Sequence, residues 1–365
     1  MQLRCPDCDA SYGDRWRCRC GSPLQFADPP RPDRPRPDPE SFDSRDGLWS
    51  FEAFLPTGND PADRVTLGEG MTPLVAADAW DASFKLDYVF PTGSFKDRGA
   101  TTTLTRAVEL GVDRVVEDSS GNAGAAIATY AARAGIDAEI YVPADVKDAK
   151  LRAIRRTGAD PVRVDGTRED VTDACLDAVR DGDAWYASHA WNPAFFAGTA
   201  TFAYETAVQR GWSVPDAVVT PVGHGTLLLG IYDGFRALYD AGWTDSMPRI
   251  VGAQAAGVAP IVEALHGVDA ASPSPEPNDA ADGIQISTPV QLDRILTAID
   301  ETDGDAIAVT EPELRAELDG LHAAGFYTEP TCAVAPAALR TARNRGTIRS
   351  DDDVVVALTG SGLKG

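Results

Sequence analysis

The sequence predicts an α/β fold in which helices cover a mainly parallel sheet. From about residue 84 onward, short apolar runs typical of buried strands alternate with helical patterns, and glycine or proline separates them. Elements that alternate in this way form parallel sheets covered on both faces. The chain has 365 residues and 43% hydrophobic composition, which is enough for two α/β lobes or one large split domain.

Seven strands are expected, and a helical pattern follows most of them. The strands are predicted at residues 113–118, 138–142, 161–164, 217–220, 249–254, 305–310 and 353–358. In parallel sheets, ligands bind beyond the carboxyl ends of the strands. The loops that directly follow strands are therefore the candidate functional sites.

Four cysteines near the start of the chain predict a small zinc ribbon. Cys5-Pro-Asp-Cys8 and Cys18-Arg-Cys20 place two pairs of thiolates on tight turns, which is the pattern of a tetrahedral zinc site. Four thiolates leave no open position on the metal, so a structural zinc is expected rather than a catalytic one. The alternative is a cysteine-bearing arm without metal. The core is the expected place of the two other cysteines, Cys175 and Cys332.

A linker is predicted at residues 27–45, between the ribbon at residues 1–26 and the rest of the chain. Proline, aspartate and arginine dominate its sequence. This composition forms neither a helix nor a paired strand, so the segment is expected to be extended or mobile.

The chain is strongly acidic, with a formal net charge of −23. This charge disfavours nucleic acid and anionic membrane surfaces as partners. The acidic residues are spread along the chain and arginine is abundant, which leads to the hypothesis of a protein adapted to high salt. The sequence shows no signal peptide and no apolar run near the roughly 20 residues of a spanning helix, so a cytoplasmic protein is expected.

Lys96 is the first candidate catalytic residue. It lies in Pro91-Thr-Gly-Ser-Phe-Lys-Asp-Arg-Gly-Ala100, where a helix is predicted to begin after a turn at Gly93. Ser94 and Asp97 have the spacing of a capping box. The helix dipole disfavours a cation in the first turn, so this lysine should lose its proton easily, and a neutral amine can form an imine with an aldehyde. The alternative is an ordinary solvated lysine.

Three loops after predicted strands carry glycine and hydroxyl residues. Residues 119–122 and residues 223–226 each open a helix, and the start of a helix is a natural anion site. Residues 359–361 follow the last predicted strand. The alternatives are tight turns without a ligand at the first two loops and a fraying end at the third.

Six motifs, in this order, resemble those of the pyridoxal-phosphate enzymes of the tryptophan synthase β-chain fold (fold type II), and especially threonine synthases. They are Gly68-Glu-Gly-Met-Thr-Pro-Leu74, Ser94-Phe-Lys-Asp-Arg-Gly99, Ser119-Ser-Gly-Asn122, Gly223-His-Gly-Thr226, Gly325-Phe-Tyr-Thr-Glu-Pro-Thr331 and Thr359-Gly-Ser-Gly-Leu-Lys364. The cysteine ribbon also resembles one found ahead of some threonine synthase-like proteins. The resemblance covers residues 1–26 and 46–365.

The resemblance implies a fold of two three-layer α/β lobes and, by analogy with relatives, a homodimer. The large lobe would consist of residues 46–92 and 206–365. The small lobe, at residues 93–205, would carry Lys96 and the asparagine loop, which consists of residues 119–122.

The resemblance also implies a role for each site residue. Lys96 would bind pyridoxal 5'-phosphate covalently and act as general acid and base, and Asn122 would hydrogen-bond the 3-oxygen of the cofactor. Thr359 would face the pyridine nitrogen. The residues that would bind the cofactor phosphate are Gly223, His224, Gly225 and Thr226. The candidates for the substrate amino acid are Ser119 and Ser120, which would bind its carboxylate, and Thr92.

One stretch departs from the threonine synthase pattern. Threonine synthases bind the phosphate of O-phosphohomoserine with polar and basic residues, but residues 189–201 carry Phe195 near the place of an arginine and have no lysine after Gly198. A dianionic phosphate needs charge-assisted partners. The leading hypothesis is the synthesis of threonine from O-phosphohomoserine and water. A threonine or serine ammonia-lyase is the alternative, and a non-catalytic binding protein is a remote one.

Overall fold

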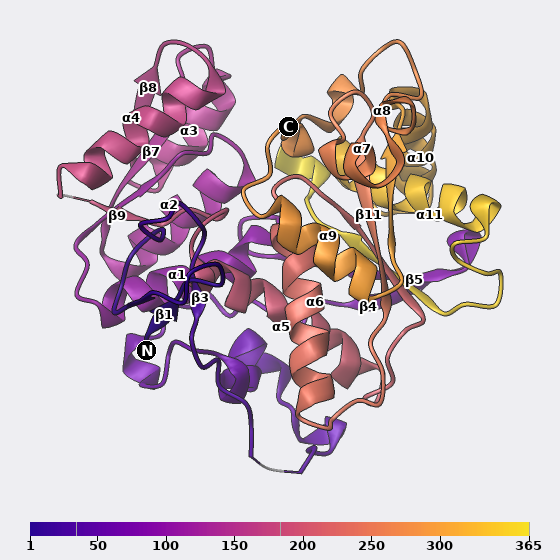
Figure 1. The fold of residues 1–365 in the computed structure, drawn as a ribbon, viewed down its shortest axis with the longest axis horizontal. Helices are drawn as coiled ribbons and strands as arrows, with labels where there is room; N and C mark the ends of the chain where they lie inside the picture. The colour runs from indigo at the N-terminus through magenta and orange to yellow at the C-terminus, as the bar shows by residue number, and fades with distance from the viewer. Residues whose placement is uncertain (34, 183, 365) are drawn as a thin grey trace. The chain divides into compact units, whose positions relative to one another are not determined.

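The computed structural model describes residues 1–33, 35–182 and 184–364 (Figure 1). The chain divides into two compact units. The first unit contains Met1–Pro32, Arg45–Gly70 and Lys96–Thr199. The second unit contains Asp33–Ser44, Met71–Phe95 and Ala200–Gly365. The domain boundaries expected from the sequence stay a prediction.

The cysteine ribbon is a small three-stranded antiparallel sheet in the first unit. Its strands are β1 (Leu3–Arg4), β2 (Ser11–Tyr12) and β3 (Gln25–Phe26), in the order β2-β1-β3. Leu3, Leu24 and two of the cysteines form its core. Such a core is too small to stabilise a fold by itself, which is typical of ribbons that need a metal.

The rest of the first unit is a four-stranded parallel sheet with helices on both faces. The strands are β6 (Arg114–Glu117), β7 (Asp137–Pro143), β8 (Asp160–Val164) and β9 (Trp185–Tyr186), in the order β8-β7-β6-β9. The helices are α1 (Lys96–Glu109), α2 (Asn122–Ala134), α3 (Asp148–Arg156), α4 (Arg168–Arg180) and the start of α5 (Pro193–Gln209). Successive residues of a strand point to opposite faces, so Val115 packs with Ile127 of α2 whereas Val116 packs with Val171 of α4.

The second unit contains a six-stranded sheet in the order β12-β11-β10-β13-β5-β4, in which all pairs are parallel except β4 with β5. The strands are β4 (Leu74–Ala77), β5 (Ala82–Leu86), β10 (Ala217–Pro221), β11 (Arg249–Ala255), β12 (Asp305–Val309) and β13 (Val354–Leu358). The helices are α6 (Thr226–Asp240), α7 (Pro260–His266), α8 (Val268–Ala271), α9 (Leu292–Glu301), α10 (Glu311–Ala323) and α11 (Val334–Arg345).

Helices also cover both faces of this second sheet. Val251 of β11 shares a core with Leu339 of α11. A Cβ at the next residue, Gly252, would point the other way and meet Leu228 of α6 at 3.3 Å. The 3-10 helices of the described residues are η1 (Pro39–Ser41), η2 (Ser44–Phe54, interrupted at Gly47 and Phe51), η3 (Pro61–Asp63), η4 (Asp78–Trp80), η5 (Asp87–Val89), η6 (Asp279–Ile284), η7 (Pro330–Ala333) and η8 (Gly362–Lys364).

All seven strands predicted from the sequence are present within a residue or two of the expected bounds. The prediction that the linker contains no helix is wrong at Pro39–Ser41, where the Asp38 side chain accepts a hydrogen bond from the Glu40 N–H and caps a 3-10 turn. The neighbouring Pro37 carbonyl accepts a 2.9 Å hydrogen bond from the Trp212 indole, so this part of the linker is attached to the second unit. In the described parts of the chain, no helix combines the length and apolar character that crossing a bilayer requires.

Candidate active site

Lys96 is the first residue of α1, and the two residues before it are fixed in the second unit. Ser94 forms an antiparallel β-bridge with Gly360, and the Phe95 N–H donates a 2.9 Å hydrogen bond to the Thr359 carbonyl. The Lys96 side chain is half-buried, so a small ligand can still reach it. The start of the helix and the fixed segment before it therefore hold the lysine backbone in place.

The capping box predicted at this helix start is wrong. Among the described residues, Oγ of Ser94 is buried without a hydrogen-bond partner, while the backbone around Ser94 forms the bridge to Gly360. Asp97 is also buried, and its Oδ2 accepts a 3.4 Å hydrogen bond from the Tyr130 hydroxyl of α2. Asp97 thus ties α1 to α2, in place of the reciprocal cap expected with Ser94.

An aromatic ring lies beside Lys96 within the first unit. The Lys96 Nζ is 5.8 Å from the centroid of the Phe195 ring, which is completely buried. This ring packs so closely on α1 that a Cβ at Gly99 would overlap it. Glycine at position 99 therefore makes room for an apolar ring next to the candidate catalytic amine.

A loop of small polar residues connects β6 to α2. Ser119 Oγ accepts a 3.3 Å hydrogen bond from the Gly121 N–H, and a Cβ at Gly124 would overlap the Ser119 carbonyl. The loop therefore folds tightly over the first turn of α2, which begins at Asn122. Ser119, Ser120 and Asn122 are all half-buried at the N-terminus of a 13-residue helix, where unpaired backbone N–H groups favour an anion.

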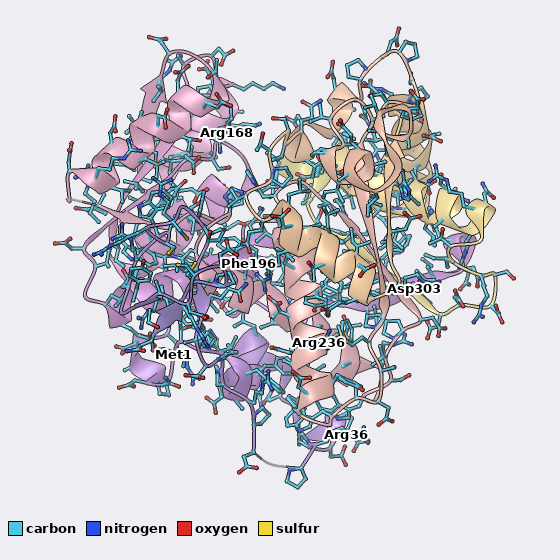
Figure 2. All side chains as sticks on the ribbon, viewed as in Figure 1. Met1, Arg36, Arg168, Phe196, Arg236 and Asp303 are labelled. Atoms are coloured by element: carbon cyan, nitrogen blue, oxygen red, sulfur yellow. The ribbon has the colours of Figure 1, made fainter. Side chains whose placement is uncertain are left out.

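Asp118 anchors this loop to the sheet and to α4. Its Oδ1 accepts a 2.8 Å hydrogen bond from the Tyr186 hydroxyl of β9. Its Oδ2 accepts hydrogen bonds from the Thr172 hydroxyl at 2.7 Å and from the Arg168 guanidinium at 3.0 Å. Arg168, labelled in Figure 2, is the first residue of α4. Sequence reasoning missed this role, although an acidic residue between a buried strand and a glycine loop was an available signal.

Glu117 and His189 form a buried pair at the same strand end. Nδ1 of His189 lies 2.7 Å from Oε1 of Glu117, and the His189 N–H donates a 3.2 Å hydrogen bond to Oε2. Burial raises the pKa of Glu117, the charge of Asp118 raises it further, and the positive charge of Lys96 opposes both effects. Lys96 therefore acts electrostatically on the strand end that carries the asparagine loop. The pair was missed because its members lie far apart in the sequence.

The second unit carries the glycine loop, between β10 and α6. Gly225 has φ of 79°, in the left-handed region, and a Cβ there would overlap the Ile295 side chain, so only glycine fits. Gly223 and His224 are half-buried, and Thr226 begins the 15-residue helix α6. The loop thus lies against unpaired N–H groups at the positive end of a helix, an arrangement that suits a phosphate.

Thr359 follows β13 in a segment that is packed rather than frayed. The Ser361 N–H donates a 2.9 Å hydrogen bond to the Gly93 carbonyl, and the Glu329 N–H donates a 3.0 Å hydrogen bond to the Gly360 carbonyl. The Thr359 side chain is nearly buried. The alternative of a fraying end is therefore wrong for the described residues of this segment.

Cys332 supports Thr359 through its sulfur atom. The N–H groups of Thr359 and Gly360 donate hydrogen bonds to Cys332 Sγ at 3.2 and 2.9 Å. Burial raises the pKa of Cys332 to about 12, so the group stays a thiol. The prediction that Cys332 and Cys175 pack in the core is confirmed, since both are completely buried. The hydrogen bonds to the sulfur of Cys332 were not foreseen.

Thr92 lies in the turn that precedes Lys96 in the sequence. Gly93 has φ of 75°, and its N–H donates a 2.7 Å hydrogen bond to the Phe90 carbonyl. Thr92 itself is half-buried, which leaves it a candidate for contact with a substrate.

A buried ion pair in the second unit fixes part of the 68–74 motif. Lys85 Nζ lies 2.8 Å from Oε2 of Glu205 and donates a 2.6 Å hydrogen bond to the Thr72 carbonyl. The same carboxylate accepts a 3.1 Å hydrogen bond from the Thr72 N–H. Both charged side chains are fully buried. The motif is thus held by charges that sequence reasoning did not identify.

The four ribbon cysteines converge as a metal site requires. All four sulfur atoms lie within 4.8 Å of one another, and the Cys5–Cys20 and Cys8–Cys18 sulfur distances are 3.5 and 3.4 Å. A tetrahedral zinc with Zn–S bonds of about 2.3 Å places its sulfurs roughly 3.8 Å apart, so this donor set fits zinc. Tyr12 hydrogen-bonds the Cys18 sulfur at 3.3 Å and lowers the pKa of that thiol, whereas burial raises the pKa of Cys5 in the same cluster.

The predicted site residues therefore fall into two sets. The first unit holds Lys96, Ser119, Ser120 and Asn122 as well as the four cysteines. The second unit holds Thr92, Gly223, His224, Gly225, Thr226 and Thr359.

Comparison with known proteins agrees with the resemblance found in the motifs. Residues 65–360 match the family described as pyridoxal-phosphate dependent enzymes. A threonine synthase of Methanosarcina acetivorans is 37% identical over 327 residues, which cover 87% of this chain and 80% of that protein. A threonine synthase of Methanocaldococcus jannaschii is 33% identical over 379 residues, which cover 100% of this chain and 93% of that protein.

A solved structure supports the fold independently. The processed form of threonine deaminase isoform 2 from Solanum lycopersicum superposes with a TM-score of 0.67 and covers 92% of this chain and 86% of its own. The two sequences are 21% identical, so this likeness concerns the fold alone.

Proposed function

Because the chain belongs to the family of pyridoxal-phosphate-dependent enzymes, we propose that it converts O-phosphohomoserine and water into threonine and phosphate. One observation supports the choice of this substrate: a threonine synthase is 33% identical across the whole of this chain, including its cysteine ribbon. The expectation of a threonine synthase-like lyase with the α/β fold of fold type II is confirmed by the family match and the relatives.

The residues present fit pyridoxal phosphate. Lys96 offers an accessible amine, and the glycine loop before α6 lies at a helix N-terminus, which favours a phosphate. We propose that Lys96 binds the cofactor covalently and that Gly223–Thr226 bind its phosphate. Asn122 would hydrogen-bond the 3-oxygen. When bound, the cofactor supplies an electron sink for negative charge at the substrate α-carbon.

The side chains around the cofactor would direct the reaction. Ser119 and Ser120, with the N–H groups at the start of α2, would bind and orient the substrate carboxylate, and Thr92 is a further candidate for substrate contact. The Lys96 amine would take the proton from the α-carbon and return it later as a general acid. A hydroxyl at Thr359 would leave the pyridine nitrogen unprotonated, which suits elimination and replacement better than transamination.

A threonine or serine ammonia-lyase is the second candidate, and the surroundings of Lys96 favour it. The ring at Phe195 lies beside the amine, and residues 189–201 contain no lysine or arginine that could neutralise a substrate phosphate. An ammonia-lyase needs the same proton transfer at the α-carbon but no second phosphate site.

A competition assay separates the two functions. Purified protein loaded with pyridoxal phosphate receives O-phosphohomoserine, threonine and serine together. Release of phosphate with formation of threonine supports the synthase, whereas ammonia and keto acid from threonine or serine alone support the lyase. Lys96→Ala should abolish either activity and the visible absorbance band of the lysine-bound cofactor. The absence of that band in the wild-type protein would instead support a binding protein without catalysis.

We also propose that the ribbon cysteines bind one structural zinc, that the protein is a cytoplasmic homodimer and that it binds no nucleic acid. Elemental analysis tests the bound zinc, and light scattering tests the homodimer. A gel-shift assay with duplex DNA tests the absence of nucleic-acid binding. The large negative charge further leads us to propose adaptation to high salt. Equal stability at low and high salt would exclude that adaptation.

A further inference from the structure

We propose that the cysteine ribbon, residues 1–26, positions the 119–122 loop through three side chains: Trp16, Tyr186 and Asp118. All of these residues belong to the first unit, so the contacts can be followed within one compact body. The proposal rests on the proposed function in one respect only, which is that the 119–122 loop binds cofactor and substrate.

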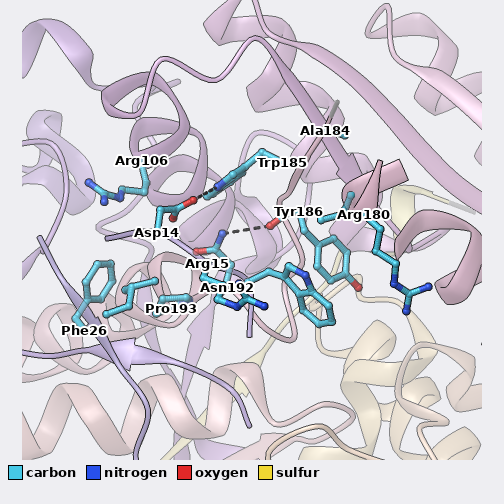
Figure 3. Close-up of a pocket in the computed structure, with 13 residues that line it drawn as sticks. Asp14, Arg15, Phe26, Arg106, Arg180, Ala184, Trp185, Tyr186, Asn192 and Pro193 are labelled. Atoms are coloured by element: carbon cyan, nitrogen blue, oxygen red, sulfur yellow. Dashed lines mark hydrogen bonds between the residues drawn. The ribbon is translucent and has the colours of Figure 1, made fainter. Parts of the chain in front are cut away.

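The ribbon contacts β9 through one polar and one aromatic interaction, and a second aromatic contact reaches Trp191 after the strand. The Trp16 ring meets Tyr186 edge-on, with centroids 5.6 Å apart and planes at 84°, and meets Trp191 edge-on at 5.1 Å and 81°. The Trp185 indole donates a 2.9 Å hydrogen bond to Oδ2 of Asp14, drawn as a dashed line in Figure 3. These contacts attach the turn at residues 14–16 directly to the strand that carries Tyr186.

A pocket of about 380 Å³ lies beside these contacts (Figure 3). It is lined on the ribbon side by residues that include Leu3 and Phe26, and on the other side by residues that include Pro193. Because side chains do not fill this part of the contact region, the attachment of the ribbon at this place comes from Trp16 and from the Asp14 hydrogen bond.

Tyr186 transmits the position of Trp16 to Asp118. Its side chain is buried, and its hydroxyl donates the 2.8 Å hydrogen bond to Oδ1 of Asp118. Burial raises the pKa of the Tyr186 hydroxyl and the charge of Asp118 raises it further, so this group remains a donor. The Asn192 side chain also donates a 3.4 Å hydrogen bond to the Tyr186 carbonyl, as Figure 3 shows. The ring therefore has a fixed place between the ribbon and the carboxylate.

Asp118 transfers this position to the loop because it is the residue immediately before Ser119. A carboxylate that accepts hydrogen bonds from Tyr186, Thr172 and Arg168 fixes the backbone from which the loop departs. If Trp16 is lost, the Tyr186 ring gains freedom and the loop loses one of its anchors. Tyr186 and Trp16 are thus positioning residues, which act through Asp118.

The contacts that lead from Trp16 through Tyr186 to Asp118 are called the relay below. Amide hydrogen exchange of the full-length protein without cofactor tests this relay directly. Trp16→Leu should accelerate exchange at residues 118–125 by roughly 3- to 10-fold, the loss expected for an aromatic edge contact. Tyr186→Phe keeps the ring but removes the hydrogen bond, so exchange there should rise by about tenfold or more. The double variant should exceed Tyr186→Phe only slightly, because both changes break the same relay. Trp16→Phe should restore most of the protection.

Trp49→Leu is the matched control, because Trp49 is a tryptophan of the same unit that packs with Leu48 and Leu55 instead of with Tyr186. The proposal predicts no selective acceleration at residues 118–125 in this variant. Equal acceleration by Trp16→Leu and Trp49→Leu would show general destabilisation and overturn the proposal. Unchanged exchange in Trp16→Leu beside faster exchange in Tyr186→Phe would overturn it as well.

A second measurement links the relay to the ligands of the loop. Titration of each variant with pyridoxal phosphate, followed by cofactor absorbance, should show at least about threefold weaker binding for Trp16→Leu and an unchanged affinity for Trp49→Leu. Unchanged affinity in Trp16→Leu despite faster exchange would refute the role of the loop in binding while leaving the relay intact. The failure of the proposed function and the failure of the relay are therefore distinguishable.

Discussion

Replacing Lys85 by methionine should lower the free energy of unfolding by about 3–5 kcal/mol, the range for a buried ion pair that loses one partner. Methionine keeps an apolar chain of similar length, so the main change is the loss of the charge and its hydrogen bonds. These bonds go to the Thr72 carbonyl, Glu205 and Gln209 at 2.6, 2.8 and 2.9 Å. Lys85 and Glu205 are both completely buried, so the variant leaves a carboxylate without its cation and without water.

The double variant Lys85→Met/Glu205→Leu should recover at least half of this loss. It removes the uncompensated charge, and the remaining cost includes the Thr72 N–H that loses its acceptor, which is about 1–3 kcal/mol. Arg180→Met is the control for a pair in water. Arg180 and Asp177 are 53% and 68% exposed and lie 2.7 Å apart, so its loss should cost less than about 1 kcal/mol.

Urea denaturation at fixed ionic strength, followed by circular dichroism and tryptophan fluorescence, measures these differences. The order of stability should be wild type and Arg180→Met first, then the double variant, then Lys85→Met. A Lys85→Met protein within about 1 kcal/mol of wild type would refute the reasoning. A double variant less stable than the single one would show that the buried Glu205 carboxylate is not destabilising in the absence of Lys85.

Three further results are expected. Because burial raises the pKa of Glu117, the folded state binds the proton of this carboxyl group more tightly than the unfolded state does. The stability of the wild type relative to Glu117→Gln should therefore fall as the pH rises above about 4.5. A difference in stability between the two proteins that calorimetry finds constant up to about pH 8 contradicts this. Cys8→Ser should reduce bound zinc from about one per chain to nearly none and lower the melting temperature, whereas Cys175→Ala should keep the metal, as elemental analysis and calorimetry will show. Cys332, buried and with its pKa raised to about 12, should resist iodoacetamide in the folded protein at neutral pH; mass spectrometry that finds it alkylated before unfolding would disprove this.

The strands were predictable where the chain follows simple rules of burial. Residues 217–220 and 353–358 are apolar runs that a parallel sheet buries on both faces. The strand β5 was missed because Lys85 lies within it, and a lysine argues against a buried strand. Its partner Glu205 is distant in the sequence, so the compensation becomes visible only in the folded chain.

The site was predictable to the extent that its features are local. Glycine and polar residues mark the helix starts at Lys96 and Asn122, and the structure has those helices begin at these residues. The hydrogen bond from Tyr186 to Asp118 and the pair of Glu117 with His189 depend on contacts across the sheet, which local spacing does not reveal. The backbone bridge between Ser94 and Gly360 is likewise a contact between segments that are distant in the sequence.

The pairing of residues 93–95 with residues 359–361 bears on the order of events during synthesis. The ribosome makes the first segment long before the second, and chain closure over such a distance comes late in folding. The segment in front of Lys96 therefore acquires its final hydrogen bonds only after β13 has been made. In a nascent chain, the segment in front of Lys96 would still lack these hydrogen bonds. We therefore expect stable binding of the cofactor only after the whole sheet has been synthesised.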